Sequence, residues 1–203
     1  MAKGSYLVDS DIAALAADGN PLVSPYNPDF VQAASVDLCL SGDRYEYTLK
    51  EYRLGDEIAD RDCRHEQFDL FTLDPHCTAH VGLIGKINIP NDSLGWVFPR
   101  SSLTRLGLRI APVFMNPGYS GLLPVTITNA AAFPIILVKG VRVGQLICAR
   151  LATTPTKTYP ERRGKYVGET VSRSKLHEDA EIKAALQRVL GAYFTESVVK
   201  AVT

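Results

Sequence analysis

The sequence predicts a mainly β protein, either a barrel or a sandwich, and two observations support this. Between about residues 44 and 152, short β-rich runs are separated by turn residues, and no helical pattern lies between them. The chain has 203 residues, of which 46% are hydrophobic and 22% charged, as is typical of a globular domain. The expected strands cover residues 45–52, 68–73, 80–89, 94–98, 122–128, 135–138 and 141–151.

A short helix is expected near the N-terminus. Asp9 or Ser10 can cap its first turn, and Ile12 and Leu15 give it an apolar side. Gly19 is expected to end it, because glycine adopts the left-handed conformation that follows many helices.

Three further segments complete the expected organisation. Residues 34–40 alternate like one more strand, whereas residues 153–173 are polar and predict a loop or flexible arm. Residues 178–190 predict an amphipathic helix whose apolar face must pack on the barrel or on a neighbouring subunit. We therefore expect a barrel domain with a tail over residues 1–173 and a helical extension over residues 174–203.

Charge and cysteine content narrow the classes of function. The 22 basic and 22 acidic residues balance, so nothing in the net charge attracts the chain to nucleic acid or acidic lipid. No run approaches the ~20 apolar residues of a membrane span, and the N-terminus lacks the apolar stretch of a signal peptide.

Cys39 and Cys148 lie in apolar runs and are expected to be core residues. We expect a cytoplasmic protein with reduced thiols that binds neither membrane nor nucleic acid.

The most informative stretch runs from residue 99 to residue 108, Pro-Arg-Ser-Ser-Leu-Thr-Arg-Leu-Gly-Leu. Arg100 adjoins the hydroxyls of Ser101 and Ser102, and Arg105 follows five residues later, so these side chains can offer several donors to one anion. The guanidinium fork suits phosphate oxygens. If residues 101–106 form a helical turn, backbone N–H groups would add to the site. The alternative is a capped surface helix without a ligand.

A second motif, from Asn116 to Gly121, predicts a tight turn. Its Pro-Gly pair favours a turn with Gly118 at positive φ. Tyr119 follows with an aromatic ring and a hydroxyl, which can line a binding site for a sugar or a base. The alternative is a plain hairpin turn.

The order and spacing of these motifs closely resemble the dCTP deaminases and, more distantly, the trimeric dUTPases. The motifs are Arg-Ser-Ser-Leu-x-Arg-Leu-Gly-Leu from Arg100, Pro-Gly-Tyr-Ser-Gly from Pro117, Asn129, and Gly-x-x-x-Gly-Gln-Leu from Gly140. Residues 8–12 and 34–38 look like the N-terminal segments of that family. Its C-terminal tail is matched by Tyr159, by Lys165-Tyr166-x-Gly168 and by Ser172-Arg173.

The resemblance implies a distorted, dUTPase-like β-barrel of the β-clip kind, assembled as a homotrimer with active sites between subunits and a tail that closes over a deoxynucleoside triphosphate. Magnesium would arrive on the triphosphate and not in a cage of side chains. The resemblance assigns nucleotide binding to Arg100, Ser101, Ser102, Arg105, Tyr119, Gln145, Tyr159, Lys165 and Glu169.

The acid–base positions depart from the family pattern. The family moves protons with a glutamate three residues before the asparagine that matches Asn129, and Thr126, a poor base, stands there. The dUTPases activate water with an aspartate that matches Asn116, which cannot ionise. In the tail, Glu169 replaces an expected glutamine and is a candidate for a relocated base. The candidate catalytic positions are thus Ser101, Arg105, Thr126 and Asn116.

Two classes of function stay open. The first is an active nucleotide enzyme, either a dCTP deaminase that forms dUTP and ammonia or a dUTP diphosphatase. The second is a non-catalytic nucleotide sensor, sequestering protein or scaffold. The residues that match the family's phosphate-binding side chains are largely present, whereas those that match its acid–base carboxylates are not. We therefore expect nucleotide binding without deamination by the family mechanism.

The sequence also contains a group of cysteine and histidine residues of the kind that bind zinc. The spacing of these residues fits no standard zinc finger, which favours structural or incidental roles. They are Cys63, His65, His76, Cys77 and His80.

Overall fold

The computed structural model describes residues 5–168 and 173–190, which divide between two compact units. The first unit comprises the described residues of 1–46 and 65–172, and the second comprises those of 47–64 and 173–203. The helices of the first unit are α1 (Asp9–Ala17), the 3-10 turn η1 (Pro28–Phe30) and α2 (Ser101–Arg105). The strands of the chain are β1 (Val23–Ser24), β2 (Val31–Gln32), β3 (Ser35–Tyr47), β4 (Cys63–Gln67), β5 (Leu70–Leu73), β6 (Thr78–Asn88), β7 (Ser93–Pro99), β8 (Leu108–Ile110), β9 (Val113–Met115), β10 (Ser120–Asn129), β11 (Ile135–Val138) and β12 (Arg142–Arg150).

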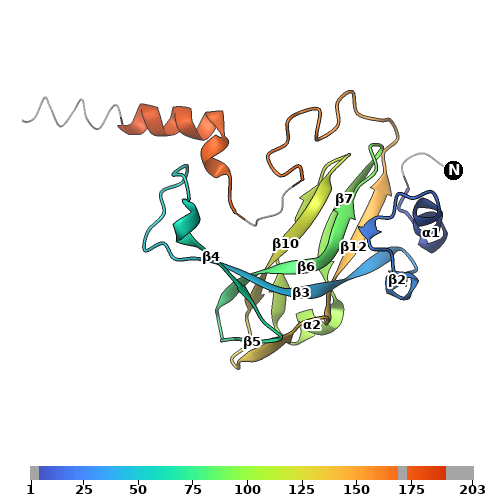
Figure 1. Cartoon of the computed structure of the whole chain (residues 1–203), viewed down its shortest axis with the longest axis horizontal. Helices are drawn as coiled ribbons and strands as arrows, with labels where there is room; N and C mark the ends of the chain where they lie inside the picture. The colour runs from blue at the N-terminus through green and yellow to red at the C-terminus, as the bar shows by residue number, and fades with distance from the viewer. Residues whose placement is uncertain (1–4, 169–172, 191–203) are drawn as a thin grey trace, which may run out of the picture. The chain divides into compact units, whose positions relative to one another are not determined.

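The main sheet curls into a distorted barrel, as the sequence predicts (Figure 1). Its strands follow the order β8-β10-β6-β3-β12-β7-β9, with β1 paired to β6 and both β2 and β4 paired to β3. The strands β11 and β5 form a separate antiparallel pair. Most neighbours along the main sheet are distant in sequence, so the fold depends on long-range pairing.

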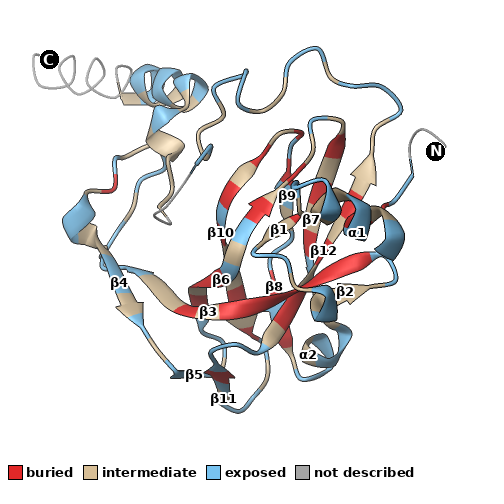
Figure 2. Cartoon of the chain, turned by 45° about the vertical axis from the view of Figure 1, so that its right-hand side comes forward, coloured by how far each residue is buried: buried red, intermediate tan, exposed pale blue. Residues whose placement is uncertain are grey.

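The strand β3 lies at the centre of the sheet, and residues 35–40 of it are all buried (Figure 2). Its apolar side chains pack with those of β6, β7, β10 and β12 in one core. Burial of this apolar surface is the main term that stabilises the barrel. The largest fully buried core residues include Leu38, Leu40, Val81, Ile87, Val97, Ile127 and Leu146.

The N-terminal helix α1 confirms the expected element and corrects its cap. Val8 is the N-cap residue, and its backbone N–H donates to the Asp11 carboxylate at 3.2 Å. The expectation of a cap at Asp9 or Ser10 is wrong, because both residues already lie in the first helical turn. Gly19 follows the helix at φ +77°, as expected of a terminating glycine.

The expected separate strand over residues 45–52 is also wrong. The strand β3 continues through to Tyr47, and no strand is assigned to residues 48–59. Gly42 permits this continuity for two reasons. Its φ of +86° suits glycine, and any other residue would place a Cβ only 2.6 Å from the Phe68 carbonyl oxygen. The register between β3 and β6 shifts between Leu40 and Arg44, so the strand passes an irregularity without ending.

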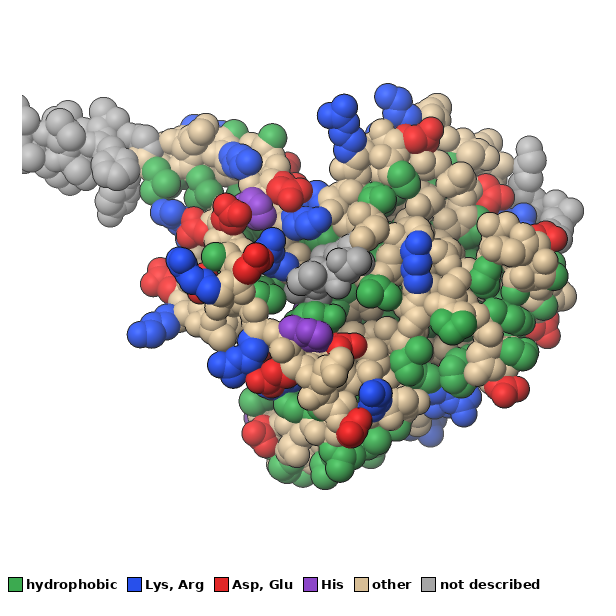
Figure 3. Space-filling view, viewed as in Figure 1, with side chains coloured by type: hydrophobic (Ala, Val, Ile, Leu, Met, Phe, Trp, Pro, Cys, Tyr) green, Lys and Arg blue, Asp and Glu red, His purple; other side chains and the backbone are tan. Residues whose placement is uncertain are grey.

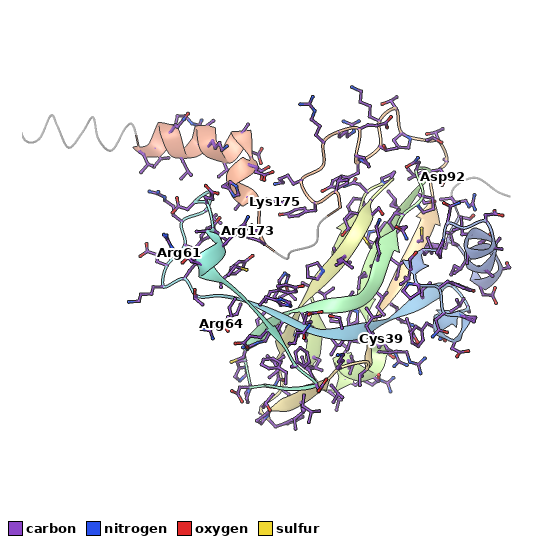
Figure 4. All side chains as sticks on the ribbon, viewed as in Figure 1. Cys39, Arg61, Arg64, Asp92, Arg173 and Lys175 are labelled. Carbon is purple, nitrogen blue, oxygen red and sulfur yellow. The ribbon has the colours of Figure 1, made fainter. Side chains whose placement is uncertain are left out.

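The second unit contains the 3-10 turns η2 (Asp60–Asp62) and η3 (Leu176–Glu178) and a helix over residues 180–190. The helix confirms most of the one expected over residues 178–190. Its apolar face packs on the segment 47–64, since a Cβ on Gly55 would lie 2.5 Å from Ile182 and 2.7 Å from Leu186. Arg173, labelled in Figure 4, pairs with Asp60.

The surface carries mixed charge, in keeping with the balanced composition. On the face shown in Figure 3, positive and negative side chains are interspersed. No described helix has the length and apolar character that a membrane crossing requires.

The cysteines are all free, and two of them are core residues as expected. Cys39, labelled on β3 in Figure 4, and Cys148 on β12 are buried, whereas Cys77 is exposed in the turn before β6. Burial raises the pKa of the Cys148 thiol to about 12. Since the thiolate is the reactive form, Cys148 is protected both by its low ionisation and by its position.

We expect a disulfide reagent such as dithionitrobenzoate to modify Cys77 in the folded protein and to leave Cys148 unmodified. Cys77 is exposed, whereas the thiol of Cys148 is buried and protonated at neutral pH. Peptide mass spectrometry after timed labelling measures both sites. Cys77→Ser should remove the fast-reacting thiol, and labelling of Cys148 at a similar rate would contradict its place in the core.

Candidate functional site

The candidate phosphate site begins at α2, which confirms the helical turn expected from the sequence. Arg100 is its N-cap residue, and the Arg100 carbonyl accepts hydrogen bonds from the backbone N–H of Leu103 (3.0 Å) and of Thr104 (3.2 Å). The Arg100 N–H donates to the Val143 carbonyl at 3.1 Å, which ties the turn to β12. Both the N–H and the carbonyl of Arg100 are therefore held by backbone hydrogen bonds.

Three predicted site residues lie on α2 itself. Ser101, Ser102 and Arg105 are all exposed, so their hydroxyl and guanidinium groups are open to a ligand. These three residues thus present two hydroxyls and one cation on a five-residue helix. Such side chains are donors that suit phosphate oxygens.

A buried carboxylate, Asp37, organises the residues around the start of α2. Its side chain is 2% exposed and forms an ion pair with Arg142 at 3.0 Å (Nη1 to Oδ2). The Arg100 Nε lies 4.0 Å from Asp37 Oδ1, and the Gln145 amide donates to the same oxygen at 3.3 Å. The Gln32 amide donates to Oδ2 at 3.3 Å. Asp37 therefore lies beside Arg100 and Gln145, two predicted nucleotide-binding residues, and its carboxylate interacts with both.

Sequence reasoning missed Asp37 and Arg142 as site residues. The available signal was a charged residue in the middle of the alternating apolar run 34–40. A carboxylate in a buried strand needs partners, because removing an unpaired charge from water is very unfavourable. The sequence alone does not show that Arg142, 105 residues away, supplies the main partner.

The turn between β9 and β10 has the geometry expected from its sequence. Gly118 has φ +81°, and a Cβ there would lie 2.8 Å from Asn91 Oδ1. Asn116 is exposed, and its carbonyl accepts the Tyr119 N–H at 3.0 Å. Tyr119 is only 5% exposed, so its ring lies in the core and not on the surface of the turn. In this structure the turn therefore presents Asn116 outward and holds Tyr119 inward.

The tail residue Tyr159 packs against this turn. Its ring centroid lies 6.1 Å from that of Tyr119, and its backbone N–H donates to the Pro117 carbonyl at 2.8 Å. The Tyr159 hydroxyl accepts the Tyr166 N–H at 3.1 Å, which folds the tail back on itself. Tyr159 thus acts as a structural anchor between the tail and the turn.

The rest of the tail is an irregular run of turns, as expected. Gly164 packs so tightly on Tyr159 that a Cβ would lie 2.3 Å from the ring, and the Gly168 N–H donates to the Ser120 carbonyl at 3.0 Å. The ammonium of Lys165 lies 5.9 Å from the centroid of the Tyr166 ring. Glu169, the remaining predicted tail residue, lies outside the described residues.

Thr126 lies on β10 in a row of partly exposed residues that alternates with buried ones. Its hydroxyl is 3.1 Å from Nδ1 of His80, which is its cross-strand partner on β6. Its backbone carbonyl accepts the Ala111 N–H at 3.0 Å. Burial lowers the pKa of His80, so its imidazole is neutral at pH 7.

Asn129, part of the family-like motif, has a structural role. It is 0% exposed, and its amide nitrogen donates to the carbonyls of Leu73 and Phe133, both at 2.9 Å. Its amide oxygen accepts the Ala131 N–H at 2.9 Å. These bonds close the turn that follows β10.

Two of the histidines named as possible metal ligands have other partners in the structure. His65 Nε2 contacts the Asp43 carboxylate at 2.9 Å, and His80 contacts Thr126. Over residues 5–168 and 173–190, no group of three or more His, Cys, Asp and Glu side chains could hold a metal ion.

The predicted site residues form three separate groups in one protomer. In the first unit, α2 lies at one end of the barrel, whereas the turn after β9 and the tail lie at the other end (Figures 1 and 2). Within the described part of the chain, no hydrogen bond or ion pair joins α2 to Asn116 or Thr126. The structure therefore brings together Arg100 with Gln145, Tyr119 with Tyr159, and Thr126 with His80, but does not bring these groups into one site.

Comparison with known proteins gives a consistent result. The family model for dCTP deaminase-like proteins matches residues 6–151. The chain is 33% identical over 181 residues to a dUMP-forming dCTP deaminase of Aquifex aeolicus, covering 88% of this chain and 98% of that protein. It is 31% identical over 171 residues to a dCTP deaminase of Acidianus ambivalens, covering 80% and 92% of the two chains.

A solved structure supports the fold. The crystal structure of 2'-deoxycytidine 5'-triphosphate deaminase from Agrobacterium tumefaciens matches with a TM-score of 0.59 and 24% identity. The match covers 73% of this chain and 49% of that one. Together with the barrel and the family model that spans most of it, these similarities show that the chain belongs to the dCTP deaminase family.

Proposed function

We propose that this chain binds dCTP as its magnesium complex and removes the 4-amino group of the base by hydrolysis, releasing ammonia. The observation that carries the proposal is α2, where Ser101, Ser102 and Arg105 are exposed beside Arg100 in a member of the dCTP deaminase family. These side chains would bind the triphosphate. The relatives from Aquifex aeolicus and Acidianus ambivalens are named as dCTP deaminases, which supports dCTP as the substrate.

The pairing around Asp37 supports binding at α2. Asp37 restrains Arg100, Arg142 and Gln145 before any ligand arrives. Preorganised donors lose little conformational freedom on binding, which favours affinity. Magnesium would enter on the phosphates, since the donors at α2 are cations and hydroxyls and not carboxylates.

The proposed assembly is a homotrimer with sites shared between copies. The separation of α2 from the tail within one protomer supports this, because a neighbouring copy would have to supply the other end of each site. Tyr159, Lys165 and Glu169 would then contact nucleotide from the tail, and Tyr119 would support the tail from beneath. The cytoplasmic location expected from the sequence stays a prediction.

A second candidate is a nucleotide-binding protein without catalysis. The resemblance matches Thr126 and Asn116 with the carboxylates that the deaminases and dUTPases use, and neither residue can act alone as a base near neutral pH. The reaction proposed above therefore needs a proton acceptor other than a carboxylate at these two positions. Hydrolysis of dUTP to dUMP is a further alternative, which the dUMP-forming relatives favour as a second step.

Isothermal titration and a coupled ammonia assay test the proposed function together. The purified chain should bind dCTP with magnesium, release ammonia, and yield dUTP or dUMP by chromatography. Binding without ammonia release would favour the non-catalytic candidate. Absence of binding to dCTP, dUTP and the other deoxynucleotides would overturn the proposal.

We expect Arg105→Gln to weaken dCTP binding by about 10- to 100-fold, because a hydrogen bond between charged groups contributes about 1.5–3 kcal/mol. Arg105 is exposed at the end of α2, so the folded state should be unaffected. Isothermal titration measures the affinity. Arg61→Gln removes an exposed cation in the second unit and serves as the matched control. Equal affinities of the two variants would exclude Arg105 from the site.

We expect Asp37→Asn to lower the free energy of unfolding by about 2 kcal/mol and to weaken dCTP binding as well. The amide cannot balance the charges of Arg142 and Arg100. Urea denaturation measures the stability loss. Asp69→Asn, at an exposed carboxylate 3.9 Å from Lys139, should change stability by less than about 0.5 kcal/mol. Equal stability of the two variants would contradict the role of Asp37.

A further inference from the structure

The partly exposed row of β10 brings Thr126 next to a histidine from another strand. In the sheet, β6 lies between β10 and β3, and the register pairs Thr126 with His80 and His80 with Tyr45. The three side chains thus come from strands distant in sequence and meet in one line across the sheet. The same face continues with the hydroxyl pair Thr78 and Thr128, whose oxygens are 2.9 Å apart.

The contact between Thr126 and His80 has the geometry of a hydroxyl and its base. His80 Nδ1 lies 3.1 Å from Thr126 Oγ1, within hydrogen-bond distance. A histidine in this position can accept the hydroxyl proton when Nδ1 carries none, which is how histidine activates hydroxyl groups in many enzymes. The pairing changes the chemistry of Thr126, because a threonine hydroxyl without a base partner ionises far above neutral pH.

The surroundings of His80 keep its imidazole neutral. Burial lowers its pKa from the usual value near 6.5. From β3, Tyr45 meets the His80 ring edge-on at a centroid distance of 6.1 Å. From β10, the strand opposite, no charged side chain faces the ring, since residues 120–129 contain none.

Two basic side chains near this face lie beside carboxylates. His65 stacks on the far partner, Tyr45, at 4.9 Å and contacts the Asp43 carboxylate at 2.9 Å. Arg44 pairs with Glu66. Each of these two basic side chains has a carboxylate beside it, whereas Arg109 of β8 lies across from Thr128 in the same row as Thr126.

We propose that His80, acting through the hydroxyl of Thr126, accepts and returns the proton in the deamination. This inference rests on the proposed function and supplies the acceptor that a threonine alone cannot provide. The water oxygen forms a bond to C4 of the cytosine as one water proton passes to Thr126 Oγ1 and the Thr126 hydroxyl proton passes to His80 Nδ1. The imidazolium then returns its proton by the same route to the 4-amino nitrogen, the C4–N4 bond breaks and ammonia leaves, while the second water proton moves from O4 to N3 to give the uracil ring. The sum is dCTP plus water giving dUTP plus ammonia.

The test compares the wild type with His80→Asn, Thr126→Val and Thr126→Ser. Asparagine places an amide group where Nδ1 lies, so it can keep the hydrogen bond to Thr126 but cannot accept a proton. We expect kcat to fall by about 10²- to 10⁴-fold in His80→Asn and in Thr126→Val, with KM and dCTP affinity nearly unchanged. Thr126→Ser keeps the hydroxyl and should retain most of the rate.

The pH profile separates proton transfer from a structural role. In the wild type, kcat should fall as the pH drops through the pKa of His80, below about 6.5, because only the neutral ring accepts a proton. His80→Asn should lose this acid limb. His76→Asn is the matched control, because His76 is exposed in the turn before β6 at φ +61°, a conformation that asparagine tolerates.

Each outcome decides one question. A normal kcat with an intact acid limb in His80→Asn would overturn the inference. A wild type that binds dCTP in titration but releases no ammonia would also overturn it, while leaving nucleotide binding in place. A wild type that binds no deoxynucleotide would overturn the proposed function itself. Thermal melts of all variants show whether a lower kcat results from unfolding. If His80→Asn unfolds, Thr126→Val tests the same proton transfer.

Discussion

The buried charge of Asp37 is the constraint on which the candidate phosphate site depends. Its strand β3 occupies the centre of the sheet, and Asp37 is the one charged residue among the described buried residues. A carboxylate there is tolerable only with cations and amides arranged around it, and Arg142, Arg100 and Gln145 meet that need. The same contacts that satisfy this carboxylate therefore place Arg142 and Arg100, the N-cap residue of α2, beside Asp37.

The two ends of the proposed chemistry are built differently. The phosphate end uses charge and is fixed by a carboxylate in the core. The acid–base end uses a neutral imidazole and a hydroxyl, Thr126, on the partly exposed face of the sheet. No described hydrogen bond or ion pair joins α2 to Thr126, so the two ends share no polar contact within one protomer.

Much of the barrel could be predicted from the sequence, because alternation and turn residues report local structure directly. The run that became β11 and the positive φ of Gly118 are examples. Pairing could not be predicted in this way. The strand β3 runs past Gly42 because of its contact with a distant loop, and the helix cap at Val8 depends on the Asp11 side chain.

Site residues that are adjacent in sequence could be predicted, whereas those brought together from distant strands could not. The residues of α2 are adjacent in sequence, so their combined chemistry is visible at once. His80 and Thr126 are 46 residues apart, and only the register of β6 on β10 makes them partners. Tyr119 follows a turn that could display it, but its packing with Tyr159 buries it instead.

The contact of the tail with the turn after β9 has a kinetic consequence. Two backbone hydrogen bonds, from Tyr159 to Pro117 and from Gly168 to Ser120, hold the tail down. With a net contribution of about 1 kcal/mol each, the tail would be open for only a few per cent of the time. A ligand that enters beneath it would associate at the diffusional rate multiplied by that open fraction, so the equilibrium of the tail would scale the speed of capture.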